Sequence, residues 1–279
     1  MPSPTASILP LDPLRYAPRP DRPVRAKSRR LAADTRVEPH SHPWAQVAFS
    51  GTGVTRVTAG RSTYIVPPSR AVWIPPQVVH AVTVVEDADM RTLYVHQPEG
   101  RCGPEVEPAQ DDAWRSCRVI EVSNLLRELV LQLSLSSQDE APAAAEQQRE
   151  HHLGALLLDE LRRAQPLPLG VALPQDKRLR HLCESMLDAP TKHPNLAGWA
   201  FEAGASPRTV ARLFRQELGT SFQQWRQQVL LAKALSLAAR KRPMSHIAAE
   251  LGYASPSAFS AMVTRSVGMA PSRFFSVEG

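Results

Sequence analysis

Two stretches in the C-terminal part of the chain follow one plan. They read Ser206-Pro-Arg-Thr-Val-Ala-Arg-Leu-Phe-Arg-Gln-Glu-Leu-Gly219 and Ser255-Pro-Ser-Ala-Phe-Ser-Ala-Met-Val-Thr-Arg-Ser-Val-Gly268, at a constant offset of 49 residues. Serine is a good helix N-cap, proline is tolerated at the first helical position, and glycine suits a left-handed C-terminal cap. The apolar residues of each stretch fall on one helical face: Val210, Leu213, Phe214 and Leu218, and then Phe259, Met262, Val263 and Val267. The pattern predicts two capped helices of about eleven residues, each with one buried stripe.

A shorter helical pattern precedes each of these helices, over residues 196–203 and 245–251, with a turn that contains glycine between the two. A helix, a tight turn and a second capped helix form the helix-turn-helix pattern. A single copy fits an ordinary helical hairpin equally well. Two copies in one small domain, joined by a helical stretch over residues 222–240, favour the DNA-binding interpretation.

The outward faces of the two predicted second helices differ. Arg208, Arg212 and Arg215 lie opposite the apolar stripe of the first, and arginine can bind a guanine edge or a phosphate in a bidentate manner. The second helix presents small and nearly uncharged residues on the corresponding face: Ser257, Ser260, Ala261 and Thr264. We therefore expect the first helix to contribute most of the base reading.

Residues 177–275 resemble the DNA-binding domain of the AraC/XylS family of bacterial transcription regulators. The likeness rests on the first capped helix and on Ile247-Ala-Ala-Glu-Leu-Gly-Tyr253 and Gly268-Met-Ala-Pro-Ser-Arg273. It implies an all-α domain in which two helix-turn-helix units, joined by a linker helix, each place a second helix in the major groove of double-stranded DNA. Family members commonly carry Arg at the position of Ala261 and Phe at the position of Val263. The predicted DNA-binding residues are Arg208, Thr209, Arg212, Arg215, Ser255, Ser257, Ser260 and Arg265.

Charge is distributed unevenly along the 279 residues, whose formal net charge is +6. Residues 31–172 carry twelve basic and eighteen acidic side chains, whereas residues 173–279 carry fourteen basic and seven acidic ones. A basic C-terminal domain is typical of a nucleic-acid-binding protein. No apolar run reaches membrane-spanning length, no signal-peptide core opens the chain, and the three cysteines lack a C-x-x-C spacing. We expect a cytoplasmic protein with reduced thiols and no membrane partner.

The N-terminal half has the texture of a small β domain. Residues 1–30 are rich in proline and arginine, which predicts a disordered basic tail or an arm that contacts DNA phosphates. Short Val-, Thr- and aromatic-rich runs between turn residues then predict a sandwich or barrel. The six predicted strands cover residues 45–49, 53–58, 63–66, 71–74, 81–85 and 91–95.

Two motifs within this region resemble the cupin barrel. His40-Ser-His42 is followed by Gln46, and Pro75-Pro-Gln-Val-Val-His80 comes later, with Gln46 where Glu is usual and Gln77 where Gly is usual. Residues two apart on a strand point the same way, so His40 and His42 are expected on one face. Imidazoles with an amide oxygen suit a divalent transition metal, and the alternative is a pocket or surface without metal. His40, His42, Gln46 and His80 are the predicted metal or ligand site, and Trp44, Trp73 and Tyr94 are predicted to line a ligand pocket or to pack in the core.

Two leucine-rich helical patterns follow the β domain. Val122, Leu126, Leu129 and Leu133 form one stripe, and Leu153, Leu157 and Leu161 form the other. They either pack on the barrel of the same chain or form a dimer interface, which the family resemblance favours. We therefore expect an α+β chain of two domains: a tail (1–30), a cupin-like sensing domain (31–117), a helical dimerisation segment (118–164), a linker (165–173) and a double helix-turn-helix domain (174–279).

Ligand-responsive, sequence-specific transcription regulation is the function that this organisation predicts. The expected partners are DNA, a small-molecule effector, RNA polymerase and a second copy of the chain, with activation of an adjacent transporter or enzyme gene as the common family role. One alternative is a cupin metalloenzyme fused to a DNA-binding domain, although no further acid-base cluster supports catalysis and no catalytic residue is predicted. A second alternative is a nucleoid-type protein that binds DNA without sequence preference.

Overall fold

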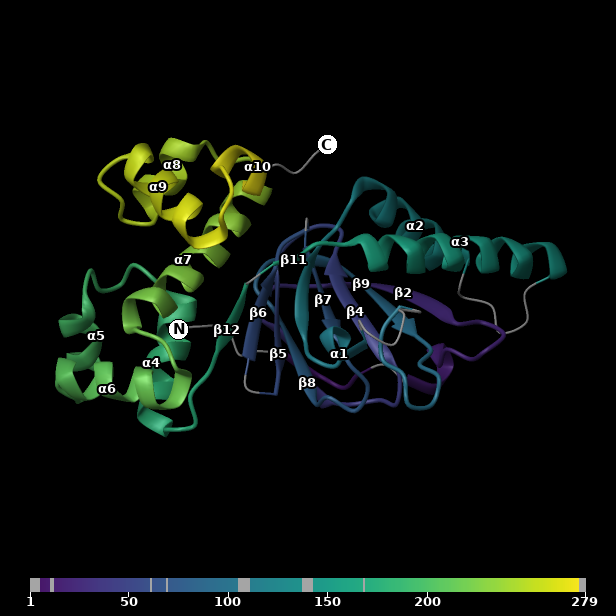
Figure 1. Cartoon of the computed structure of the whole chain (residues 1–279), viewed down its shortest axis with the longest axis horizontal. Helices are drawn as coiled ribbons and strands as arrows, with labels where there is room; N and C mark the ends of the chain where they lie inside the picture. The colour runs from purple at the N-terminus through teal and green to yellow at the C-terminus, as the bar shows by residue number, and fades with distance from the viewer. Residues whose placement is uncertain are drawn as a thin grey trace. The chain divides into compact units, whose positions relative to one another are not determined.

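The computed structural model describes residues 6–10, 13–60, 62–68, 70–104, 111–136, 143–167 and 169–275. The chain divides into two compact units, and the division along the sequence falls between Pro168 and Leu169. The first unit is a β structure with helices on one sheet, and the second is helical (Figure 1). No helix in the described ranges is long and apolar enough to cross a membrane.

Two sheets build the first unit. One contains the order β1-β3-β8-β5-β6, and the other has the order β11-β10-β7-β4-β9-β2. The strands of the first sheet are β1 (Ala6–Ile8), β3 (Thr35–His40), β5 (Thr55–Ala59), β6 (Ser62–Val66) and β8 (His80–Val84). Those of the second are β2 (Val24–Leu31), β4 (Ala45–Ser50), β7 (Arg70–Ile74), β9 (Ala88–Val95), β10 (Arg118–Glu121) and β11 (Pro166–Leu167). All six predicted strands are present within a few residues of their expected bounds.

The prediction of a disordered tail over residues 1–30 is wrong for the described part of that segment. It contains β1, the 3-10 helix η1 (Pro13–Tyr16) and β2. β2 pairs antiparallel with β9 over its whole length, from Val24 opposite Val95 to Leu31 opposite Ala88. This long ladder pairs the backbone N–H and C=O groups of β2 with those of β9. The many basic residues of β2 hide the strand in the sequence.

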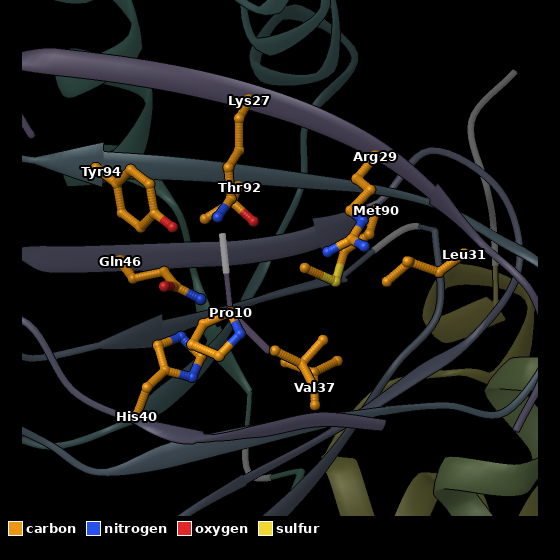
Figure 2. A pocket seen from close by; sticks show the side chains of 11 residues that line it. Pro10, Lys27, Arg29, Leu31, Val37, His40, Gln46, Met90, Thr92 and Tyr94 are labelled. Carbon is orange, nitrogen blue, oxygen red and sulfur yellow. The ribbon is translucent and has the colours of Figure 1, made fainter. Parts of the chain in front are cut away.

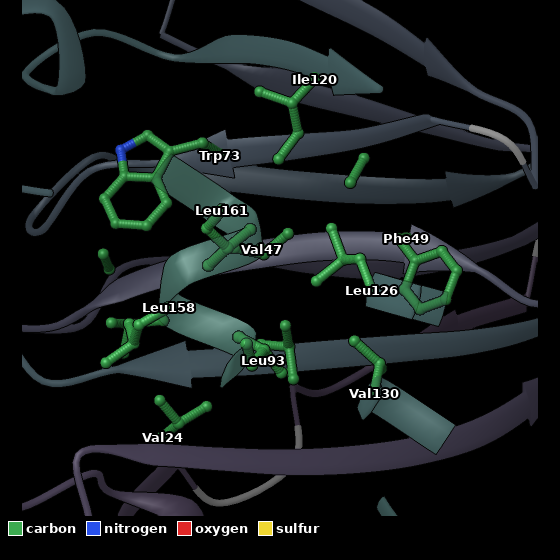
Figure 3. Close-up of a cluster of buried hydrophobic side chains, with 14 of the residues drawn as sticks. Val24, Val47, Phe49, Trp73, Leu93, Ile120, Leu126, Val130, Leu158 and Leu161 are labelled. Atoms are coloured by element: carbon green, nitrogen blue, oxygen red, sulfur yellow. The ribbon is translucent and has the colours of Figure 1, made fainter. Parts of the chain in front are cut away.

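The second sheet is covered on one face by α2 (Asn124–Ser136) and α3 (Ala144–Arg163). Leu126, Leu129 and Leu133 from α2 pack with Leu157 and Leu161 from α3 against the sheet. The sheet contributes Val24, Val47, Phe49, Trp73, Leu93 and Ile120 to this cluster (Figure 3). Both leucine stripes are therefore buried within their own chain, and the prediction that they form the dimer interface is wrong.

A buried ion pair fastens α3 to the segment before β2. Arg22 donates from Nε to Glu150 Oε2 at 3.0 Å and from Nη2 to both carboxylate oxygens, at 2.9 and 2.6 Å. The two side chains are only 4% and 5% exposed. Breaking such a pair leaves one charge buried without its partner, so the contact fixes the position of the helix on the barrel.

The second unit begins with β12 (Gly170–Ala172) and contains the helices α4 to α10. Their bounds are α4 (Lys177–Asp188), α5 (Leu196–Glu202), α6 (Pro207–Leu218), α7 (Phe222–Ala239), α8 (Met244–Glu250), α9 (Pro256–Val267) and α10 (Pro271–Phe275). Val171 and Leu173 are buried in its core, and Trp225 Nε1 donates to Ala172 O at 2.7 Å. The end of the predicted linker therefore belongs to this unit, because its apolar residues cover α4 and α7.

The two predicted capped helices are α6 and α9. Ser206 accepts a hydrogen bond from Thr209 N, and Ser255 accepts one from Ala258 N, each at 3.1 Å. Gly219 and Gly268 end the helices in the left-handed conformation, with φ of 64° and 73°. A side chain at these two glycines would meet the steric cost of positive φ, which explains why both copies end in glycine.

Candidate functional site

Three histidines converge inside the barrel. His40 ends β3 opposite His80 at the start of β8, while His42 lies in the loop after β3 rather than on the predicted strand. Their ring centroids are 4.3 Å apart for His40 and His80 and 5.2 Å apart for His42 and His80. One nitrogen from each ring lies within 4.8 Å of the corresponding nitrogen of the other two. The structure therefore brings together the three histidines that were predicted for a metal or ligand site.

Backbone carbonyls set the tautomer of all three rings. The Nδ1 atoms of His40, His42 and His80 lie 2.8, 2.8 and 2.9 Å from the carbonyl oxygens of Glu38, Trp44 and Val78, respectively. A carbonyl only accepts, so each Nδ1–H donates and each Nε2 keeps its lone pair. Three imidazoles that each keep an Nε2 lone pair, clustered in this way, are a donor set that suits a divalent transition metal.

The amide of Gln46 completes the cluster. Its Oε1 lies 2.9 Å from His42 Nε2 and 3.2 Å from His80 Nε2. An oxygen facing two lone pairs is unfavourable, so the amide either turns its NH₂ group toward both rings or shares a cation with them. Burial lowers the pKa of His40 and of His42, and it lowers the pKa of His80 to about 3. The rings are therefore neutral at pH 7, which is the form that binds metals.

The turn before His80 is fastened to the loop that carries His42. Gln77 occupies the position where cupin proteins usually have glycine, and it adopts a left-handed backbone with φ of 63°. Its N–H donates to His42 O at 2.9 Å. A side chain in this conformation costs about 1–2 kcal/mol, and the hydrogen bond to the histidine loop offsets part of that cost.

A narrow pocket lies beside the histidine cluster (Figure 2). Lys27 and Arg29 from β2 line it together with Tyr94 from β9, and the Nζ atom of Lys27 lies 4.9 Å from the Tyr94 ring centroid. The remaining lining residues are Pro10, Leu31, Val37, His40, Gln46, Val82, Met90 and Thr92. Sequence reasoning missed Lys27 and Arg29, although the alternation of basic residues at 25, 27 and 29 is the signal of a strand with one basic face.

The three predicted aromatic lining residues have different environments. Tyr94 lines the pocket, and Trp44 stacks on His42 with a centroid distance of 5.2 Å. Trp73 is fully buried on the opposite side of the sheet, where its Nε1 donates to Trp114 O at 2.9 Å. The prediction of Trp73 as a pocket residue is therefore wrong, because β7 directs this side chain toward the helices.

The candidate nucleic-acid interface is the outward face of α6. Arg208, Arg212 and Arg215 are all exposed there, and Arg212 Nη1 donates to Gln216 Oε1 at 2.6 Å. Thr209 is half-buried, and its hydroxyl lies 2.9 Å from that of Ser206. The equivalent face of α9 exposes Ser257, Ala261 and Thr264, with Ser260 half-buried and Arg265 exposed beside them. Ser255 caps α9 by accepting a hydrogen bond from Ala258 N, and Pro256 has no N–H, so Ser257 N is the first-turn donor that remains for a phosphate.

Comparison with known proteins assigns both units. Residues 24–161 match the model of the AraC-like ligand binding domain, and residues 199–276 match that of a helix-turn-helix domain. The chain is 29% identical to the HTH-type transcriptional regulator NimR of Escherichia coli over 84% of its own length and 81% of that protein. It is 28% identical to the arabinose operon regulatory protein of Escherichia coli over 41% of its length and 40% of that protein.

Among solved structures, ToxT from Vibrio cholerae aligns over 91% of this chain and 98% of its own, with 8% identity and a TM-score of 0.36. The two family matches together span most of the chain and follow the order of the two structural units. The protein therefore belongs to the AraC family of transcription regulators, with a cupin-like ligand-binding domain followed by a helix-turn-helix DNA-binding domain.

Proposed function

We propose that this regulator reads a specific promoter sequence mainly through α6 and that a small molecule bound inside its barrel changes the affinity for that sequence. The exposed cationic face of α6 carries the proposal, because Arg208, Arg212 and Arg215 are long donors on one side of a capped helix. Arginine pairs with guanine N7 and O6 in the major groove. Thr209, Ser255, Ser257, Ser260 and Arg265 supply backbone contacts and weaker base contacts.

The effector binds in the pocket lined by Lys27 and Tyr94, beside the histidine cluster. A ligand changes DNA affinity only if it favours one of two conformations of the protein, so its contacts must differ between them. We place the effector here because the pocket lies within the unit that matches the ligand-binding family model. The relatives are transcription regulators, and we propose regulation rather than catalysis for this chain.

The histidine cluster also suits a divalent metal. His40, His42 and His80 would bind it through Nε2, with Gln46 Oε1 as a fourth ligand. When bound there, a Zn²⁺ or similar ion would supply a Lewis acid. Elemental analysis of the purified protein and of His42→Ala tests this part: one bound metal in the wild type and none in the variant is expected.

Homodimerisation is the third part of the proposal, and the outer surface of the helical pair supports it. Leu125 on α2 and Leu156 on α3 are 51% and 52% exposed, whereas the stripes on the inner side are buried. Leu125→Glu with Leu156→Glu should yield monomers by sedimentation velocity, while the control Arg36→Glu, at an exposed position on the sheet that the helices do not cover, should remain dimeric. A double variant that stays dimeric would place the interface elsewhere. RNA polymerase at a neighbouring promoter is the further partner that we propose.

Selection from a random double-stranded DNA library, at one fixed salt concentration, tests the central proposal with the full-length protein. Enrichment of a defined sequence, with most of its information under the first helix-turn-helix unit, is the expected outcome. Binding without any enriched sequence would indicate a nucleoid-type protein, since phosphate contacts carry affinity but no sequence preference. Footprinting of the selected site then gives the assay in which effectors are tested.

A further inference from the structure

Helix α4 lies against one flank of α6 (Figure 1). The cleft between them is lined from α4 by Arg178, Leu179 and Leu182 and from α6 by Thr209, Arg212 and Leu213. Successive residues of a helix are rotated by about 100°, so Thr209 points sideways from the outward face that carries Arg208 and Arg212. Helix α4 therefore stands at the edge of that outward face, on the side of Arg212.

The width of the major groove determines what this flank meets on DNA. The groove of B-DNA is about 12 Å wide, and an α-helix with its side chains is about 10–12 Å across. A recognition helix therefore fills the groove, and an element packed on its flank reaches the phosphates that border the groove. With α6 in the groove, the first turn of α4 faces this border.

Arg178 is the cation that α4 presents at this edge. It lines the cleft together with Arg212, and its side chain is exposed. Among the described residues, none forms a hydrogen bond or an ion pair with its guanidinium. Asp176 also lines the cleft, but its Oδ1 caps α4 by accepting Leu179 N at 2.9 Å. The Arg178 guanidinium is therefore available to an anion outside the chain.

The position of Arg178 is unfavourable for the helix itself. Lys177 and Arg178 form the start of α4, and the first turn has no acidic residue. The dipole of a helix places partial positive charge at its N-terminus, so cations there are repelled. The stability of α4 gives no reason for an arginine at this position, whereas a contact with a phosphate does.

The start of α4 is held in a fixed position relative to α6. Glu217, near the end of α6, accepts hydrogen bonds from Gln175 N at 2.6 Å and from Asp176 N at 3.0 Å. Leu179 and Leu182 are buried in the core that contains Val210 of α6. A phosphate contact from α4 therefore restricts where α6 can lie along the groove.

The second helix-turn-helix unit has no cation at the corresponding position. Helix α7 precedes α8 and α9 as α4 precedes α5 and α6, and the offset of 49 matches Arg178 with Gln227. Gln227 is uncharged and half-buried. The contact is therefore expected at the first unit alone.

We propose that Arg178 binds a DNA phosphate at the border of the major groove that α6 enters and so positions α6 along that groove. The inference rests on the proposed function, because it takes α6 as the reading helix. The contact adds affinity and orientation but no base preference, since every base pair carries the same phosphates. Helix α4, which lies outside both helix-turn-helix units, thereby becomes part of the DNA-binding surface.

The salt dependence of binding by the full-length protein to the selected DNA site tests the proposal. Arg178→Gln should reduce the slope of log affinity against log salt by about 0.9, because one phosphate contact is lost. Between about 50 and 200 mM salt, the affinity advantage of the wild type should then shrink by about 3.5-fold. Arg178→Lys should keep the slope. Arg36→Gln is the charge-matched control, because it removes an exposed cation of the cupin-like unit, and it should also keep the slope.

Methylphosphonate linkages, each of which removes the charge of one phosphate, locate the contact. One such linkage beside the first half-site should weaken the wild type severalfold and leave Arg178→Gln unaffected. A wild-type salt slope in Arg178→Gln would overturn the proposal, as would equal losses for variant and wild type at every linkage. An altered base preference of Arg178→Gln in site selection would indicate a base contact and would also contradict it. Urea unfolding of the variant should match that of the wild type, since Arg178 is exposed.

Failure of the broader proposal has a different signature. If site selection enriches a sequence under α6 but Arg178→Gln keeps the wild-type slope, the reading role of α6 stands and the phosphate contact is wrong. If no sequence is enriched, the salt slope is measured on random DNA. A reduced slope of Arg178→Gln there would support the phosphate contact and contradict sequence-specific reading by α6.

Discussion

The two helix-turn-helix units share a framework and differ in what they present to DNA. α6 and α9 have the same N-cap, the same proline at the first position and the same left-handed glycine at the end. Their outward residues correspond through the offset of 49, so that Arg208 matches Ser257, Arg212 matches Ala261 and Arg215 matches Thr264. One face is cationic, while the other carries hydroxyl and methyl groups.

The difference shows that framework and reading surface are separate properties of one motif. Caps and inward apolar residues determine whether the helix forms and packs, and both copies keep them. The outward residues contribute little to folding, since exposed substitutions away from caps change stability by about 0.5 kcal/mol or less. The second helix-turn-helix unit therefore keeps its fold without long donors on its outward face.

The largest expected effect tests the shared framework. Phe214 packs on Trp225 with a centroid distance of 5.6 Å, and Phe259 packs on Tyr253 at 5.3 Å; both phenylalanines are fully buried. Phe214→Ala and Phe259→Ala should each lower the free energy of unfolding by about 3–5 kcal/mol in urea denaturation, because each leaves a large cavity. A cost below about 1 kcal/mol for either variant would show that the unit concerned is not independently packed.

The next effect separates the two faces. Arg212→Ala should weaken binding to the selected DNA site by about 1–3 kcal/mol and relax the preference at one or two base pairs, because it removes a bidentate donor. Ser257→Ala should weaken binding much less, since a hydroxyl is too short for such a pair. Binding-site selection at fixed salt for both variants measures this, and equal information in the two half-sites would contradict the assignment.

Removal of either N-cap should have a smaller effect on stability, and the effect should be the same in both helix-turn-helix units. Ser206→Ala and Ser255→Ala each remove a side chain that accepts one backbone N–H at 3.1 Å. Each should reduce the free energy of unfolding by about 1 kcal/mol, as other N-cap replacements do. Replacement of the exposed Ser257 by Ala serves as the control, and a cap variant indistinguishable from it would show that its cap is not needed.

The smallest expected effect is a pH dependence of the stability of the first helix-turn-helix unit. Glu202 accepts hydrogen bonds from Lys192 Nζ at 2.7 Å, from His193 Nε2 at 2.6 Å and from Ser185 Oγ at 3.0 Å. These contacts, with Lys192 the strongest, lower the pKa of the Glu202 carboxyl from 4.5 to about 2. A lowered folded-state pKa means that the stabilisation is present above pH 4.5 and is lost as the pH falls toward 2.

Glu202→Gln should remove this part of the acid dependence, as measured by unfolding of wild type and variant at pH 2 to 5. NMR titration of the wild type gives the pKa of the Glu202 carboxyl itself. The residue at the equivalent position of the second unit is Leu251, which is buried, so no counterpart exists there. Glu250→Gln is the matched control, because its single contact with His246 is longer, at 3.3 Å. An unchanged carboxyl pKa near 4.5 in the wild type would contradict the prediction.

Sequence reasoning succeeded where the structural signal is local. Ser206 and Gly219 bound their helix through contacts within one turn, so their spacing alone predicted α6. The histidine motifs predicted a shared site even though His42 lies outside the strand, because the Gln77 turn holds the two segments together.

It failed where the partner of a residue lies far along the chain. The basic run of β2 looks disordered until β9 pairs with it, and Lys27 becomes a pocket residue only through that pairing. The stripe of Leu126 and Leu129 predicts a covered face without saying what covers it, and the answer is the sheet of the same chain. The position of Trp73 failed for the same reason, since sequence does not give the side of the sheet.

Helix α7 joins the two helix-turn-helix units. It runs without interruption from Phe222 to Ala239 and starts with a capping box formed by Ser221 and Gln224. Each residue of an α-helix adds about 1.5 Å and a rotation of about 100°. A single residue inserted in α7 would therefore barely lengthen it but would turn α9 by more than a quarter of a circle relative to α6. The length of α7 therefore fixes the rotation of α9 relative to α6. Substitutions on the outward face of either helix leave this rotation unchanged, whereas a change of one residue in the length of α7 would misalign the two faces.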